Sequence, residues 1–161
     1  MVPYPNSGEP EWRDLKGQLW RVESHGWIDI GIRNCAFRLF GAPDPGTGVR
    51  HLVAYLTEQG RFYVLPGYIL DGSSVPLLGR WLDNRTSGWP ATVHDAAHEA
   101  MRARRLSGEQ RTQFAALYRD MLKAFGAWSV TAWLCYAGLR LFGAASADPD
   151  SGEEYAIRGG Q

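Results

Sequence analysis

The spacing of apolar residues changes once along this chain, near residue 90. Before that point, short runs rich in Val, Ile, Phe, Tyr and Trp alternate with Gly, Asn and Pro, which is typical of strands joined by turns. The breaker-rich residues 41–48 predict a loop, and residues 58–60 predict a hairpin turn. We therefore expect a small, mainly antiparallel sheet built from residues 19–23, 27–33, 36–40, 49–57 and 61–70.

After residue 90 the apolar residues recur at helical spacing. Pro90 suits the first turn of a helix, where its missing N–H is no loss, so we expect a helix over residues 90–105. The sequence Ser107-Gly108-Glu109-Gln110 has the form of a capping box and predicts the start of a second helix. One face of this second helix should be buried, because apolar residues recur on it at Phe114, Leu117, Met121 and Leu122.

A third helix is expected over about residues 127–142, after a break at Gly126, and it is apolar on nearly every side. A membrane-spanning helix needs roughly 20 apolar residues, whereas this run is shorter and contains Arg140. We therefore predict a buried or partner-facing helix and no membrane span. Together with the strands, the three C-terminal helices predict an α+β fold in which the helices pack with the sheet.

The two ends of the chain differ from its middle in composition. Residues 1–17 predict an extended N-terminal arm, residues 18–143 a single α+β domain, and residues 144–161 an acidic C-terminal tail. Residues 1–5 have neither the basic nor the apolar region of a signal peptide, so we expect none.

Composition narrows the classes of function. The chain has 161 residues, of which 45% are hydrophobic and 12% aromatic, enough for one proper core. Lys plus Arg and Asp plus Glu both total 17, giving a net charge of zero. Nucleic acid is therefore not an expected partner, because its binding leaves an excess of basic residues. Cys35 and Cys135 lie far apart without metal-type spacing, which predicts two reduced core cysteines and folding in a reducing cytoplasm.

Candidate chemistry is concentrated in two short segments. The first is Asp71-Gly72-Ser73-Ser74-Val75-Pro76, which has the composition of a tight turn after a strand. The second is His94-Asp95-Ala96-Ala97-His98-Glu99, just inside the first expected helix. We expect both segments to face one cleft, which would be the candidate site.

A metal site is one interpretation of these segments. His94 and His98 are four residues apart, so on a helix they share a face with Cβ atoms about 6 Å apart and can bind one metal ion, zinc being the candidate. The segment resembles the zinc-protease pattern H-E-x-x-H with Asp in place of Glu. Asp71 is the best candidate for a third ligand and Glu99 the second. The structural alternative is that one histidine hydrogen-bonds the preceding loop while the other is half exposed.

Catalysis without metal is a second interpretation. His94 would act as a general base oriented by Asp71 or Asp95, and it would activate Ser73 or Ser74 as a nucleophile. The alternative is local, because Asp, Gly and Ser in this order also form a turn through their own hydrogen bonds. Two tryptophans near these segments would line a ligand groove or belong to a protein interface: Trp81 and Trp89.

These motifs carry a resemblance to a known family. A Gly, then Asp-Gly-x-Ser-x-Pro, then a helix opening with His-Asp, and finally Arg-x-Phe-Gly resemble the phage-associated domain-of-unknown-function family thirteen fifty-three. Here they are Gly67, residues 71–76, His94-Asp95 and residues 140–143. The chain departs from the family at His98, where members usually carry an aromatic residue, and at Arg111, where they carry an acidic one. The resemblance implies a phage or prophage setting, often near tail and lysis genes, and no established reaction.

Two functions of different class follow from the sequence. The first is a bacteriophage virion protein, a tail component made in the host cytoplasm, whose arm, tryptophans and tail dock onto other virion proteins in a symmetric assembly. The second is a small hydrolase of the cell envelope that uses Asp71, His94 and His98 around a metal, or His94 as base. A soluble cytoplasmic assembly helper is a third hypothesis.

Overall fold

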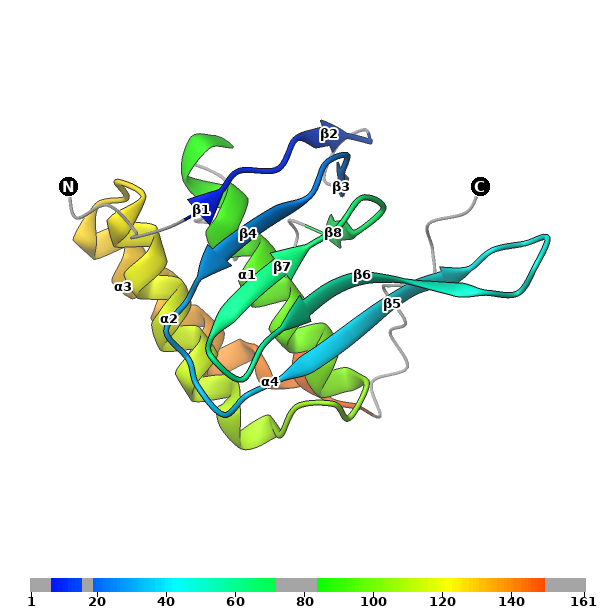
Figure 1. Ribbon diagram of the computed structural model, residues 1–161. Helices are drawn as coiled ribbons and strands as arrows, with labels where there is room; N and C mark the ends of the chain where they lie inside the picture. Colours follow the sequence, from blue (N-terminus) through cyan, green and yellow to red (C-terminus); the bar gives the residue numbers. More distant parts are fainter. Residues whose placement is uncertain (1–6, 16–18, 72–83, 150–161) are drawn as a thin grey trace. The chain divides into compact units, whose positions relative to one another are not determined.

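The computed structural model describes residues 7–15, 19–71 and 84–149, and the chain divides into two compact units (Figure 1). Residues 6–71 belong to the first, which we call the sheet unit, and residues 72–151 belong to the second, the helical unit. Antiparallel sheets in the N-terminal half and helices in the C-terminal half make this an α+β fold, which confirms the predicted class.

The sheet unit contains a five-stranded and a three-stranded sheet, and every strand pair is antiparallel. In the larger sheet the strand order is β1 (Ser7–Gly8), β4 (Gly26–Asp29), β7 (Arg61–Val64), β6 (Arg50–Leu56) and β5 (Phe37–Pro43). In the smaller sheet the order is β2 (Trp12–Asp14), β3 (Leu19–Val22) and β8 (Ile69–Asp71). Two of the strands, β1 and β2, therefore lie within the expected N-terminal arm.

Alternation of side chains gives the larger sheet one buried face, because successive residues of a strand point to opposite sides. Phe37 and Phe62 lie on that face with their ring centroids 6.3 Å apart. On the other face, Tyr55 and Tyr63 stack at 4.6 Å. The buried residues of these strands are Ile28, Phe37, Leu39, Val53, Ala54, Leu56, Phe62 and Val64.

The predicted hairpin turn at residues 58–60 is confirmed between β6 and β7. Gly60 has φ +86°, which favours glycine, and a Cβ there would lie 2.7 Å from the carbonyl oxygen of Ile32. The Gly60 carbonyl in turn accepts a hydrogen bond from the Ile30 N–H at 2.8 Å. A side chain at this position would therefore break the turn and its contact with the neighbouring loop.

Three strand predictions were wrong in their limits. The strand expected over residues 27–33 ends at Asp29 in β4. Residues 41–43 were expected in a loop, but β5 continues through them and Pro43 pairs with Arg50 across register shifts, which absorb the irregular residues. Residues 61–70 were expected to form one strand, but a turn at residues 65–67 divides them between β7 and β8, which join different sheets. The breaker residues between β7 and β8 therefore end a strand, whereas those at residues 41–43 only make β5 irregular.

The helical unit contains α1 (Asn84–Arg102), the 3₁₀ helix η3 (Gly108–Gln110), α2 (Arg111–Ala124), α3 (Ser129–Phe142) and the short α4 (Ala144–Ala147). The prediction that Pro90 opens the first helix was wrong, because α1 begins at Asn84 and Pro90 lies inside it. Pro90 has no N–H to donate to the carbonyl four residues earlier, so that hydrogen bond of the helix is missing.

The predicted capping box is confirmed at the start of η3. Ser107 Oγ accepts a hydrogen bond from the Glu109 N–H at 3.3 Å, and Gln110 Oε1 accepts one from the Ser107 N–H at 3.2 Å. The chain then enters α2, which ends before Gly126 with φ +97°.

Helix α2 contacts both α1 and α3. Between α2 and α3 lies a buried cluster of Ala115, Tyr118, Leu122, Ala132, Cys135 and Leu139. Both cysteines are free and buried, as predicted. None of the helices in the described ranges is long and apolar enough to cross a bilayer.

Candidate functional site

The helical unit has an unusual polar feature, a pair of buried histidines on α1. His94 is 3% exposed and His98 is 2% exposed. Their ring centroids are 4.1 Å apart with an interplanar angle of 44°, as expected for side chains one helical turn apart. The sequence interpretation that one of them is half exposed was therefore wrong.

Residues from α2 and from the end of α3 complete the surroundings of the pair. The Tyr118 ring lies 5.1 Å from the His94 ring, and Gly143 comes so close that a Cβ there would lie 3.5 Å from His98 Cε1. The Arg-x-Phe-Gly motif thus reaches the histidine pair through Gly143, whereas Leu141 and Phe142 of the same motif are exposed. The sequence patterns did not single out Tyr118, although helical spacing places it on the same face as Phe114 and Met121.

Asp95, the next residue on α1, makes a polar contact with the first histidine of the pair. His94 Nδ1 lies 3.3 Å from Asp95 Oδ1, so the carboxylate holds this ring nitrogen. His94 Nε2 is buried and has no hydrogen-bond partner among the described residues. Burying an imidazole nitrogen without a hydrogen bond lowers the stability of the folded protein. The same atom is the one that would accept a proton or bind a ligand.

Burial keeps both imidazoles neutral. Loss of solvation, with a smaller effect of the Arg102 charge, lowers the pKa of His94 from 6.5 to about 4. Loss of solvation is also the main cause that lowers the pKa of His98. The charges of His94, Arg102 and Arg111 lower it further. Burial raises the pKa of Tyr118, so the phenol stays protonated. At neutral pH the cluster is therefore an uncharged core element.

The fit of this cluster to a metal ion is poor in the described part of the chain. No group of three or more His, Cys, Asp or Glu side chains there is arranged to hold a metal. The two nearby guanidinium groups of Arg102 and Arg111 that lower the His98 pKa would also oppose a divalent cation. The third ligand proposed from the sequence was Asp71, whose side chain lies outside the described residues, so that prediction remains untested.

The other predicted site residues are placed as follows. Asp71 is the last residue of β8 and its backbone pairs with Leu19, in the sheet unit. Trp89 is buried on α1, where it belongs to the core of that region. Three further candidates lie outside the described residues: Ser73, Ser74 and Trp81.

A second candidate surface is the outer side of α3, which is apolar and exposed. Trp128 is 82% exposed and Leu141 is 73% exposed. The opposite side of the same helix buries Ala132, Cys135 and Leu139 against α2. We call the exposed set the α3 apolar face: Trp128, Val130, Trp133, Leu134, Leu141 and Phe142. The sequence predicted a buried or partner-facing helix here. It did not predict which side of the helix is exposed.

The α3 apolar face is bordered by cations on the side nearest α2. The Arg119 guanidinium lies 4.7 Å and the Lys123 ammonium 5.5 Å from the centre of the Trp133 ring. Arg140 donates a hydrogen bond to Thr112 Oγ1 at 3.2 Å. Asp120 pairs with Arg119, so this border keeps an excess of positive charge.

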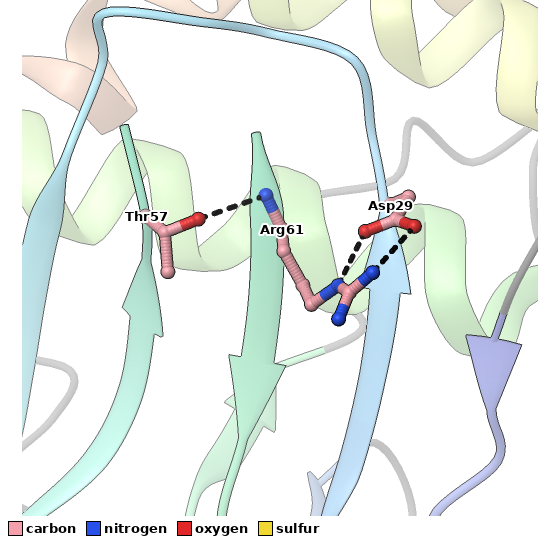
Figure 2. A network of polar contacts seen from close by, with 3 residues as sticks. All are labelled: Asp29, Thr57 and Arg61. Carbon is pink, nitrogen blue, oxygen red and sulfur yellow. Dashed lines mark hydrogen bonds and ion pairs between the residues drawn. The ribbon is translucent and has the colours of Figure 1, made fainter. Parts of the chain in front are cut away.

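The sheet unit has a polar hollow of its own, whose lining includes Asp29, Thr57 and Arg61. Figure 2 shows the polar contacts among these three side chains. Arg61 donates to both carboxylate oxygens of Asp29, at 2.6 and 3.0 Å, and its N–H donates to Thr57 Oγ1 at 3.1 Å. The guanidinium also lies 4.6 Å from the centre of the Trp27 ring. The bidentate ion pair ties β4 to β7, and Asp29 already matches the charge of Arg61.

No protein-family model, curated protein or solved structure matches this chain.

Proposed function

We propose that this chain is a bacteriophage virion protein, a tail component that docks onto neighbouring subunits through the α3 apolar face. The single observation that carries the proposal is the exposure of large apolar side chains on the outer side of α3. Monomeric soluble proteins rarely leave a contiguous apolar patch of this kind uncovered, because its hydration is unfavourable. A neighbouring subunit would remove it from water.

The composition of the face supports a protein partner. It combines Trp and Phe with bordering Arg, which are the residue types enriched at protein interfaces. Trp133 is already held by Arg119 and Lys123, so its orientation is partly fixed before any partner binds. A preorganised aromatic side chain loses less conformational freedom on docking.

The phage setting is proposed from the motif resemblance. Of the elements that resemble family thirteen fifty-three, His94 is buried in the helical unit, and Gly143 lies close to His98, which packs on His94. A role for these residues in shaping the core fits a structural protein, because neither histidine is accessible to a large substrate.

The test is quantitative mass spectrometry of purified particles of the phage that encodes this chain. We expect a fixed copy number relative to a ring-forming tail protein. Leu141→Ser should lower that copy number at least several-fold, since it removes an exposed apolar side chain from the face. Val49→Ser is the matched control, because Val49 is also an exposed apolar residue but lies in the sheet unit.

Absence of the chain from particles, while it is abundant in infected cells, would reject the virion proposal. An unchanged copy number for Leu141→Ser would instead reject the α3 face as the docking surface.

The alternative proposal is a small envelope hydrolase with His94 as general base. It is favoured by the His94–Asp95 contact and by His94 Nε2, which no described residue engages. It predicts that His94→Gln abolishes hydrolysis of purified cell-wall material while the protein stays folded. No hydrolysis by the unsubstituted protein, with or without added zinc, would reject it.

A further inference from the structure

The polar hollow of the sheet unit has the size of a small-molecule site. Its volume is about 570 Å³, and ligand pockets usually measure about 300–1,000 Å³. All of its lining residues belong to the sheet unit, so the hollow is formed within one compact part of the chain: Asp29, Gly31, Arg33, Thr57, Gln59, Gly60, Arg61 and Tyr63.

Backbone hydrogen bonds hold the two loops that line the hollow together. One loop follows β4 and the other is the turn between β6 and β7. The Ile30 N–H donates to the Gly60 carbonyl at 2.8 Å, and the Asn34 N–H donates to the Glu58 carbonyl at 3.1 Å. Loops that are tied to each other in the free protein lose little conformational freedom when a ligand binds.

The Arg61 side chain is also fixed before a ligand binds. Its guanidinium donates to both carboxylate oxygens of Asp29 (Figure 2). It makes a further side-chain hydrogen bond with Tyr63 and lies 4.6 Å from the centre of the Trp27 ring. The hollow therefore presents a guanidinium and a carboxylate side by side in a set orientation.

The lining combines hydrogen-bond donors with acceptors. Arg33 and Gln59 are exposed, so their guanidinium and amide groups can reach a ligand. Asp29 supplies acceptor oxygens, and the Thr57 hydroxyl both donates and accepts. A ligand rich in hydroxyl groups matches this mixture, because each hydroxyl also donates and accepts. Phosphate or sulfate fits it less well, since both are repelled by the Asp29 carboxylate.

The Tyr63 ring, in contrast, has its faces occupied. The His25 ring stacks on it at 5.7 Å and the Tyr55 ring at 4.6 Å. His25 directly precedes β4 and Tyr55 lies on β6, and these strands flank β7 on opposite sides. A nucleic-acid base, which binds such surfaces by stacking, therefore finds no open face on this ring.

From the mixed lining and the fixed walls we propose that the hollow binds a saccharide through the hydroxyl groups of a sugar ring. Asp29 accepts a hydrogen bond from one hydroxyl, while Arg33 and Gln59 donate to others. The inference concerns the sheet unit alone and does not depend on docking through the α3 apolar face.

Saturation-transfer NMR of the full chain tests the inference with single sugars. The probes are glucose, galactose, mannose, rhamnose, N-acetylglucosamine and glucuronic acid, each at millimolar concentration, because a site built from hydrogen bonds alone binds one sugar weakly. We expect saturation to reach the ring protons of at least one of them. No transfer to any of the six would overturn the inference.

Titration of the bound sugar into four variants locates its site. Arg33→Ala and Gln59→Ala should each raise the dissociation constant by about three- to tenfold, since each removes a hydrogen bond to the ligand. Arg50→Ala and Glu58→Ala are the matched controls, because both residues are exposed in the sheet unit without lining the hollow. The controls should bind like the parent, and all four variants should keep its melting midpoint. Equal dissociation constants for all four would place the sugar elsewhere and contradict the proposal.

Asp29→Asn separates a saccharide from an anion, with inorganic phosphate as the second probe. The substitution should weaken sugar binding, because the carboxylate is the stronger acceptor, but it should strengthen phosphate binding by removing a repulsive charge. Phosphate binding that rises in Asp29→Asn and falls in Arg33→Ala, with no sugar bound, would identify an anion site and overturn the inference. If Asp29→Asn does not fold, the comparison of Arg33→Ala with Arg50→Ala still decides, since both positions are exposed.

Discussion

Helices α1 and α3 invert the usual placement of polar and apolar side chains in opposite ways. Helix α1 buries His94 and His98, whereas α3 exposes Trp128, Leu141 and Phe142. Burial of the histidines is tolerated because both stay neutral and pack against rings and a glycine. Exposure of the α3 residues has no such compensation within the described helical unit. The buried histidines thus belong to the core of the helical unit, and the exposed apolar residues form the face that we propose as the docking surface.

The largest expected effect separates the two sides of α3. Leu139 is 5% exposed, whereas Leu141 on the same helix is 73% exposed. Leu139→Ala should lower the free energy of unfolding by about 2–5 kcal/mol because it leaves a cavity in the core. Leu141→Ala should change it by less than about 0.5 kcal/mol, as is usual for surface positions. Urea unfolding of the two variants measures both, and equal losses would erase the distinction between the sides.

The next effect concerns the buried histidines and acid. The His94 pKa is about 4 in the folded protein and 6.5 in the unfolded chain, so the unfolded chain binds more protons between these values. Stability from this group is complete above pH 6.5 and is lost as the pH falls towards 4, by about 3 kcal/mol. Urea unfolding across this range measures the loss.

His98→Phe serves as the comparison for the acid effect, because it removes one buried imidazole and keeps an aromatic ring. Its unfolding free energy should fall less steeply with decreasing pH than that of the parent. Parallel profiles for parent and variant would mean that the pair is not held neutral by burial.

A smaller effect is expected at the glycine that closes the histidine core. A Cβ at Gly143 would lie 2.5 Å from the Leu139 carbonyl oxygen, so Gly143→Ala must shift the backbone at the end of α3. We expect a loss of about 1–3 kcal/mol, typical of overpacking. Gly108→Ala is the control, since a Cβ there meets nothing within 4 Å. Equal thermal midpoints for the two variants would contradict the close approach of Gly143 to the Leu139 carbonyl.

Local patterns predicted much of the fold because they depend on neighbouring residues alone. The capping box at Ser107, the turn before Arg61 and the α3 limits follow from side chains that bond or pack within a few positions. Pro90 was misplaced because a proline inside a helix is retained only when tertiary packing offsets the lost hydrogen bond. Residues 41–43 were misplaced for a related reason, since pairing with β6 carries the strand through them.

The sequence by itself determined that His94 and His98 share a helical face and that α3 is apolar on nearly every side. Only the tertiary structure decided that the two histidines are buried against Tyr118 and Gly143, and that Val130, Leu134 and Leu141 are exposed. The physical reason is that helical periodicity fixes which side chains lie together, whereas coverage of a face depends on contacts between residues far apart in the chain.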